Sequence, residues 1–252
     1  MKRRIWSVIA VMLLIFNTTA YAADDPPQAD NPPRTENLAS VVKLNFYRDS
    51  GVYGNICVGT LLSDDIVITA SHCILDKWAT APDKTLEVQY GKEFSQTAGL
   101  YKGEGRAWIK FDPETDLALI RIDTSVTGQA DAAPATLVDA CSTVPVLDGP
   151  VTGIAYRRMK ALHTSLPTAE HNTSTIAFSR TGNSALANGK SYISDNGPHA
   201  VGGDSGGGVF SEDGILFGVF NGTSGKHDYV SALCVYADRI RAESAALGSP
   251  VP

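Results

Sequence analysis

Three residues whose types cooperate in nucleophilic catalysis occur in order along the chain, each within a short motif. The motifs are Ile-Thr-Ala-Ser-His-Cys around His72, Asp-Leu-Ala-Leu-Ile beginning at Asp116, and Gly-Asp-Ser-Gly-Gly-Gly around Ser205. A serine hydroxyl is a weak nucleophile at neutral pH and needs a neighbouring base, a role that suits imidazole. A carboxylate can in turn hold the orientation and tautomer of the imidazole. Taken alone, His72 also fits a structural histidine, Asp116 a turn residue and Ser205 a flexible loop. Together, the three residues predict acyl transfer.

The elements that must position these residues are short strands. Residues 86–90 alternate between apolar and polar side chains, as a strand with one buried face does, whereas 65–70 and 117–122 are apolar runs typical of buried strands. Gly, Asn, Asp and Ser cluster between the runs as turn residues. The predicted strands are 41–46, 65–70, 86–90, 117–122, 151–156, 175–178, 208–210 and 216–220.

One helix is predicted, at 237–247, where Ala237 and Ile240 share a face opposite charged side chains. Residues 130–135 lack a strand pattern and predict a connector between two halves of the chain. The pattern as a whole therefore indicates an all-β protein with a terminal helix.

The first 22 residues are typical of a secretory signal peptide rather than of a folded element. Lys2, Arg3 and Arg4 precede an apolar run from Ile5 to Phe16, and an Ala-Tyr-Ala cleavage pattern follows. The run is too short to span a bilayer, so secretion is favoured over the alternative, an uncleaved signal anchor. We therefore expect a secreted protein, periplasmic or extracellular and of bacterial origin, with no membrane association.

Residues 23–37 are rich in proline and polar side chains, and they predict a linker or a short propeptide. Removing residues 1–22 takes away three cations and no carboxylate, which leaves 18 Lys and Arg against 27 Asp and Glu, a balance of −9. No basic stripe remains, which argues against nucleic acid as a partner.

Four cysteines in an exported chain predict two disulfides, and the spacing alone leaves all three connectivities open. A metal site is the alternative, but no Cys-x-x-Cys or His-x-x-x-His pair accompanies them, so we expect none.

The three motifs together resemble the trypsin/chymotrypsin family of serine proteases over roughly residues 38–245. The Thr-Ala-Ala-His-Cys of that family is present with Ser71 in place of the second alanine, its Asp-Ile-Ala-Leu as Asp-Leu-Ala-Leu, and its Gly-Asp-Ser-Gly-Gly intact. The resemblance implies a secreted serine endopeptidase with a His72–Asp116–Ser205 triad that works through an acyl-enzyme and needs no metal or organic cofactor.

The resemblance also implies a fold of two antiparallel six-stranded β-barrels with a C-terminal helix. Barrel 1 is expected over about 38–130, barrel 2 over about 140–236 and the helix over 237–247, within a protease domain of 38–252. The amides of Gly203 and Ser205 are expected to form the oxyanion hole. The implied disulfides are Cys57–Cys73, beside the histidine, and Cys141–Cys234.

The chain departs from the family at its start. Family members begin their mature chain with Ile-Val-Gly-Gly, whose amine inserts beside the aspartate that precedes the serine, here Asp204. No such sequence is present, and cleavage after Arg34 would leave a polar Thr35 terminus. The sequence leaves open whether such a cut occurs or none is needed.

The expected specificity pocket also differs. The residue expected at its floor is His199 rather than an aspartate, and Thr223 is also expected in the pocket. Asp228 aligns with the pocket wall, where it could pair with His199 or bind a basic side chain. His199 favours an acidic substrate side chain, whereas Asp228 favours a basic one, and both hypotheses stand. Phe220-Asn221-Gly222 occupies the place of the Ser-Trp-Gly of the family, on the strand that pairs with extended substrate.

Two rival functions come from other classes. A catalytically silent homologue would act as a binding module, although here all three triad positions are filled. An esterase of the α/β-hydrolase type would share Gly-x-Ser-x-Gly, but it would carry its histidine after the serine and show βα alternation. The expected partners of the favoured protease are protein or peptide substrates and a protein protease inhibitor, and we expect a monomer.

Overall fold

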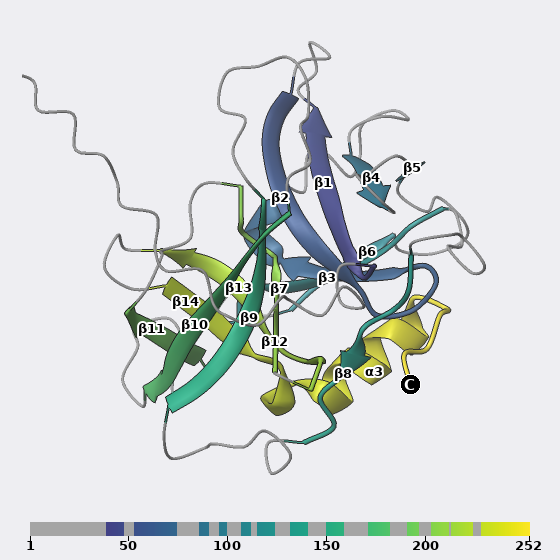
Figure 1. Ribbon diagram of the computed structural model, residues 1–252. Helices are drawn as coiled ribbons and strands as arrows, with labels where there is room; N and C mark the ends of the chain where they lie inside the picture. The colour runs from purple at the N-terminus through teal and green to yellow at the C-terminus, as the bar shows by residue number, and fades with distance from the viewer. Residues whose placement is uncertain are drawn as a thin grey trace, which may run out of the picture.

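The structure is a computed structural model that describes residues 39–47, 53–74, 86–90, 96–99, 107–111, 115–123, 132–140, 150–158, 171–181, 191–196, 203–211, 213–223 and 228–252. Figure 1 shows two sheets and a C-terminal helix. The strands of the first sheet are β1 (Val41–Tyr47), β2 (Tyr53–Leu61), β3 (Ile66–Ala70), β4 (Leu86–Tyr90), β5 (Gln96–Gly99), β6 (Trp108–Lys110) and β7 (Leu117–Arg121). Those of the second are β8 (Thr136–Leu137), β9 (Pro150–Arg158), β10 (His171–Thr181), β11 (Ser191–Asn196), β12 (Gly208–Phe210), β13 (Ile215–Thr223) and β14 (Asp228–Ala232). The helical elements are η1 (Ser71–Cys73), η3 (Leu233–Val235) and α3 (Ala237–Ala246).

The first sheet has the order β5-β4-β1-β2-β3-β7-β6, and all its neighbours are antiparallel. Its two edge strands, β5 and β6, are consecutive in the chain. One connection therefore joins the two edges, as in a sheet that curls toward a barrel.

The second sheet closes on itself. Its order is β12-β9-β10-β11-β14-β13-β8, and β12 also pairs with β13. These pairings make a ring of six antiparallel strands, to which the two-residue β8 adds in parallel beside β13. Closure of this kind removes exposed strand edges.

The apolar runs of β3 and β7 are buried on both faces because each strand lies between two cores. Ile68 and Leu119 belong to a core shared with the second sheet, where they join residues such as Phe217. Their neighbours Val67 and Ile120 belong to a separate core inside the first sheet. Alternate side chains of a strand point to opposite faces, so a strand with a core on each side has no polar face.

Helix α3 packs its predicted face inward, with Ala237, Ile240 and Ser244 buried. The segment after it is tied to the first sheet by Arg121, which donates to Asp65 Oδ2 at 2.9 Å and to the Leu247 carbonyl at 2.8 Å. The C-terminal segment therefore contacts the first sheet although it follows the second in sequence.

The all-β fold with a terminal helix is confirmed. The predicted number of six strands holds for the closed ring of the second sheet. Each of the two sheets, however, contains seven strands in total. In the first sheet, the short strands β5 and β6 form the two edges and bring the number of strands to seven. Within the described residues these two strands do not pair with each other, so no pairing closes this sheet. None of the described helices is long and apolar enough to cross a membrane.

Candidate active site

The pairing of β3 with β7 brings the first two candidate residues together. Ala70, the last residue of β3, is opposite Leu117, the first residue of β7. The next residue on one strand and the preceding residue on the other are then neighbours, and the Ser71 amide donates to the Asp116 carbonyl at 2.9 Å. The register of two buried strands thus places the His72 turn beside Asp116.

The imidazole of His72 faces the Asp116 carboxylate. His72 Nδ1 lies 2.7 Å from Asp116 Oδ2, and the His72 backbone amide donates to Oδ1 at 2.8 Å. Because an ionised carboxylate can only accept, Nδ1 carries the proton and the neutral ring keeps its lone pair on Nε2. The His72 side chain is 43% exposed and that of Asp116 is 22% exposed, so the imidazole is open to solvent while its partner is more enclosed.

Asp116 itself has a left-handed backbone conformation, with φ of 46°. Aspartate tolerates this region better than most residues. The residue before it is held from the second sheet, because Ser231 Oγ on β14 donates to the Thr115 carbonyl at 2.5 Å. Asn221 Nδ2 on β13 donates to that same Ser231 oxygen at 2.7 Å.

The turn that carries Ser205 is held between the two sheets. The Ser205 carbonyl accepts from the Val58 amide of β2 at 2.8 Å. The amide of the next residue, Gly206, donates to the Phe220 carbonyl of β13 at 2.8 Å. Gly206 has φ of 83°, and a Cβ there would overlap the Thr69 hydroxyl and the Val58 carbonyl. Only glycine fits this close approach.

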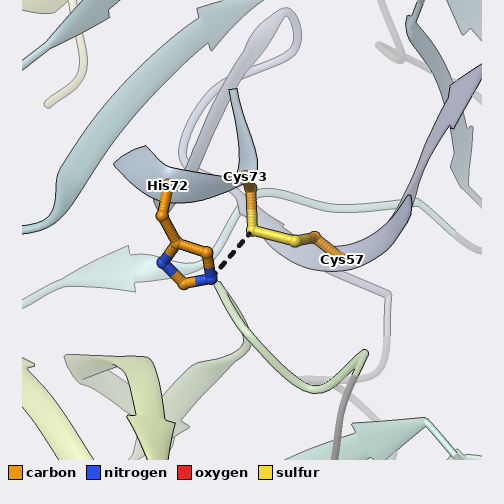
Figure 2. A group of neighbouring side chains, drawn as sticks. All are labelled: Cys57, His72 and Cys73. Atoms are coloured by element: carbon orange, nitrogen blue, oxygen red, sulfur yellow. Dashed lines mark hydrogen bonds between the residues drawn. A yellow bond between two sulfur atoms is a disulfide. The ribbon is translucent and has the colours of Figure 1, made fainter. Parts of the chain in front are cut away.

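The backbone of Ser205 contacts the turn that carries His72 at the side chain of Cys73. The Ser205 carbonyl oxygen lies 3.8 Å from Cys73 Sγ, which in turn lies 3.9 Å from His72 Nε2. Figure 2 shows the Nε2 edge of the His72 ring turned toward this sulfur. Among the described residues there is no hydrogen bond between the Ser205 hydroxyl and His72.

The two amides expected to form an oxyanion hole belong to the same turn. Gly203 has φ of 105°, a conformation that favours glycine. Neither the Gly203 nor the Ser205 amide donates a hydrogen bond within the described part of the chain. Asp204, between them, is buried.

Cys57 and Cys73 form a disulfide beside His72 (Figure 2). The sulfur atoms and a His72 ring nitrogen lie within 4.8 Å of one another, a spacing that could suit a metal ion. Metal ligation by cysteine requires thiolates, however, and both sulfurs are committed to the disulfide. This group therefore does not fit a metal.

Cys234 is also disulfide-bonded. Its predicted partner Cys141 lies outside the described residues, as do the signal segment, the 23–37 segment and the Arg34 cleavage site.

The candidate pocket residues are described in part. Thr223, at the end of β13, is exposed and is opposite Asp228 of β14 in the backbone register. The third candidate, His199, lies outside the described residues.

Sequence reasoning missed two residues that support Asp116. In the sequence Ser71 is only a departure from a motif, whereas in the structure its hydroxyl donates to Asp116 Oδ1 at 2.9 Å. Ser231 carried no signal, because a lone serine within a strand is ordinarily a solvent-facing residue.

A family model described as trypsin matches residues 32–239. No curated protein matches the chain by sequence. Among solved structures, HL collagenase superimposes with a TM-score of 0.64 at 18% identity, covering 82% of this chain and 94% of that chain. A scabies mite inactivated protease paralogue, S-I1, has a TM-score of 0.63 at 16% identity, covering 85% of this chain and 98% of that chain. A mutant of human heparin binding protein has a TM-score of 0.64 at 14% identity, covering 87% of this chain and 96% of that chain.

Proposed function

This chain belongs to the trypsin family and is a serine-type endopeptidase, and from that premise we propose that it is secreted and that His72, Asp116 and Ser205 cleave its substrates. The observation that carries the triad is the 2.7 Å contact between His72 Nδ1 and Asp116 Oδ2. This contact fixes the one tautomer in which Nε2 can accept a proton.

In the proposed reaction Ser205 Oγ attacks the carbonyl carbon of the scissile bond while His72 Nε2 takes the hydroxyl proton. Asp116 stabilises the imidazolium that forms. His72 then gives the proton to the leaving amine, which departs as the peptide bond breaks and leaves an acyl-enzyme on Ser205. A water molecule, activated by the same imidazole, releases the acid product and regenerates the hydroxyl.

Hydrogen bonds between a catalytic nucleophile and its base are often long before substrate binds and shorten when it does. The contacts of Ser205 with Val58 and Cys73 support a position for the serine next to the histidine turn. The amides of Gly203 and Ser205, which donate no hydrogen bond to the described residues, support the oxyanion hole, in which one donor is typically worth about 3 kcal/mol in the transition state.

We expect extended protein or peptide segments to be the substrates, bound along β13 at Gly222. Gly222 pairs with Tyr229 of β14 on one side, and on the other side the pairing with β12 ends at Val219, so the described strands leave this edge of β13 open at Gly222. An open strand can pair with substrate backbone.

In this proposal His199, Thr223 and Asp228 determine which substrate side chain is preferred at P1, the residue before the cleaved bond. A panel of fluorogenic peptides that differ only at P1 separates the two charge hypotheses. Preference for acidic P1 favours His199 and preference for basic P1 favours Asp228, while equal rates across the panel would discard both.

Secretion is supported by the sequence of residues 1–22 and by the Cys57–Cys73 disulfide, since disulfides persist in oxidising compartments. The disulfide state of Cys234 supports the proposed Cys141–Cys234 bridge. N-terminal sequencing of the active protein tests the leader directly: a start at residue 23 marks signal removal alone, and a start at Thr35 marks a second cut.

Hydrolysis of a casein or peptide substrate by matched variants tests the triad. We expect Asp116→Asn to lower kcat about 10⁴-fold, as it does in other enzymes with this triad, because the amide no longer holds the productive tautomer. Asp213→Asn is the control, since it makes the same change of charge at an exposed residue of the turn before β13. Equal activity of Asp116→Asn and the unmodified protein would reject the triad.

A further inference from the structure

The Asp116 carboxylate accepts three hydrogen bonds from the described residues, and one comes from a side chain outside the proposed triad. Oδ2 accepts from His72 Nδ1, while Oδ1 accepts from the His72 amide at 2.8 Å and from Ser71 Oγ at 2.9 Å. The hydroxyl of Ser71 is therefore a direct partner of the oxygen opposite the imidazole.

The division of these bonds between the two oxygens matters for the orientation of the carboxylate. The terminal torsion of an aspartate is broad and weakly restrained, so hydrogen bonds must set the plane of its carboxylate. With Ser71 Oγ removed, Oδ1 would keep a single donor, the backbone amide of the same histidine that binds Oδ2. Among the described residues, both remaining bonds would then come from His72, and no second residue would fix the plane.

Neighbouring side chains do not offer an equivalent donor in the described structure. Phe220 of β13 is apolar and buried, and Ser231 Oγ donates to the Thr115 carbonyl instead. Ser71 is also tied to Asp116 through its backbone, at 2.9 Å, so its hydroxyl is held close to the carboxylate. The side chain of the alanine at this position in the family motif could not donate.

We propose that Ser71 is a positioning residue, whose hydroxyl fixes the Asp116 carboxylate in the plane that His72 needs. This inference rests on the proposed function of His72 and Asp116. Ser71 acts through Asp116 and touches neither the substrate nor the reacting atoms.

Three variants test the role. Ser71→Ala removes the hydroxyl, and Ser71→Thr retains it. Ser63→Ala is the matched control, because Ser63 lies just before β3 and also donates to a carboxylate, Asp65 Oδ1, at 3.3 Å. We expect Ser71→Ala to lower kcat about 10-fold with KM within twofold of the parent, because only the transition state develops the imidazolium that Asp116 stabilises.

Ser71→Thr is expected to stay within threefold of the parent kcat, and Ser63→Ala to leave kcat unchanged. If Ser71→Thr loses as much activity as Ser71→Ala, the serine acts by its size and the proposal is overturned. It is equally overturned if all three variants retain the parent kcat. Thermal unfolding of each variant separates these results from a loss of folded protein.

A second measurement does not depend on activity. The proton between His72 Nδ1 and Asp116 should give a downfield ¹H NMR signal, assigned by its loss in His72→Ala. We expect this signal to broaden or shift in Ser71→Ala and to persist in Ser71→Thr and Ser63→Ala. An unchanged signal in Ser71→Ala contradicts the positioning role, whereas an inactive parent protein with the expected pattern contradicts only the proposed catalysis.

Discussion

At the scale of single residues, the site depends on backbone conformations and hydrogen bonds that sequence motifs do not show. The motifs single out His72 and Asp116 because their flanking residues are distinctive, and the structure brings the two side chains to 2.7 Å. The left-handed backbone of Asp116 and the bond from Ser71 could not be predicted, because both depend on the register of strands distant in sequence.

Gly206 offers a direct test of the serine turn. Gly206→Ala would place a Cβ against the Thr69 hydroxyl and the Val58 carbonyl while φ is 83°. We expect the turn to move, with a loss of about 10²-fold in kcat/KM, since a displacement of roughly 1 Å has that effect on a catalytic group. Left-handed strain should also lower the free energy of unfolding by about 1–3 kcal/mol.

Urea denaturation and initial rates check this prediction. Gly222→Ala is the control for stability, because no atom lies within 4 Å of its added Cβ. A Gly206→Ala protein as stable and as active as the parent would show that the turn is not held as described.

At the scale of elements, strands with a plain pattern were predictable and strands shaped by their neighbours were not. The prediction for 86–90 matches β4, whose side chains alternate between buried and half-buried, and that for 208–210 matches β12. β2 was not predicted, because glycine weakens a strand pattern. The structure supplies the reason for one such glycine, since a Cβ at Gly59 would lie 2.6 Å from Val67 Cγ1.

The contact between β14 and the Asp116 turn gives a prediction at this scale. Ser231 is buried and connects Asn221 to the Thr115 carbonyl. Ser231→Ala should cost about 1–3 kcal/mol in the free energy of unfolding, because buried polar groups lose a partner. It should also lower kcat, since the turn that carries Asp116 is no longer held from the second sheet.

Ser244→Ala is the matched comparison. Its hydroxyl is also buried, donates to the Arg241 carbonyl at 2.8 Å and accepts from the Val251 amide at 2.9 Å. Ser244 lies in α3, C-terminal to all three site motifs. We expect Ser244→Ala to lose similar stability in urea denaturation and to keep the parent kcat. Equal effects of the two changes on kcat would contradict a specific role for Ser231.

At the scale of the whole molecule, one core joins the two sheets, and the candidate residues come from both sides of it. Ile68 and Leu119 of the first sheet pack with Phe217 and Phe220 of the second, and the Ser205 turn bonds to both sheets. The connector expected at 130–135 indicated two halves, whereas the shared core and the closure of the second sheet could be recognised only from the strand pairings. The edge strands of the first sheet, β5 and β6, are too short for a sequence pattern to predict them.

The Cys57–Cys73 disulfide provides the prediction at this scale. Both cysteines are buried in the core of the first sheet, and they are 16 residues apart in sequence. Replacing both with alanine should lower the free energy of unfolding by about 3 kcal/mol, because the unfolded chain regains its freedom. Differential scanning calorimetry should show a lower Tm, and a Tm equal to that of the parent would contradict a structural role for the bridge.

The most direct test of the central claim is covalent labelling with a peptidyl organophosphonate, followed by mass spectrometry of the digested protein. If the triad is correct, one phosphonyl group per molecule will attach to Ser205, and His72→Ala will react much more slowly because the hydroxyl then lacks its base. No adduct in the intact protein, or an adduct on another residue, would contradict the claim and would favour a catalytically silent binding module.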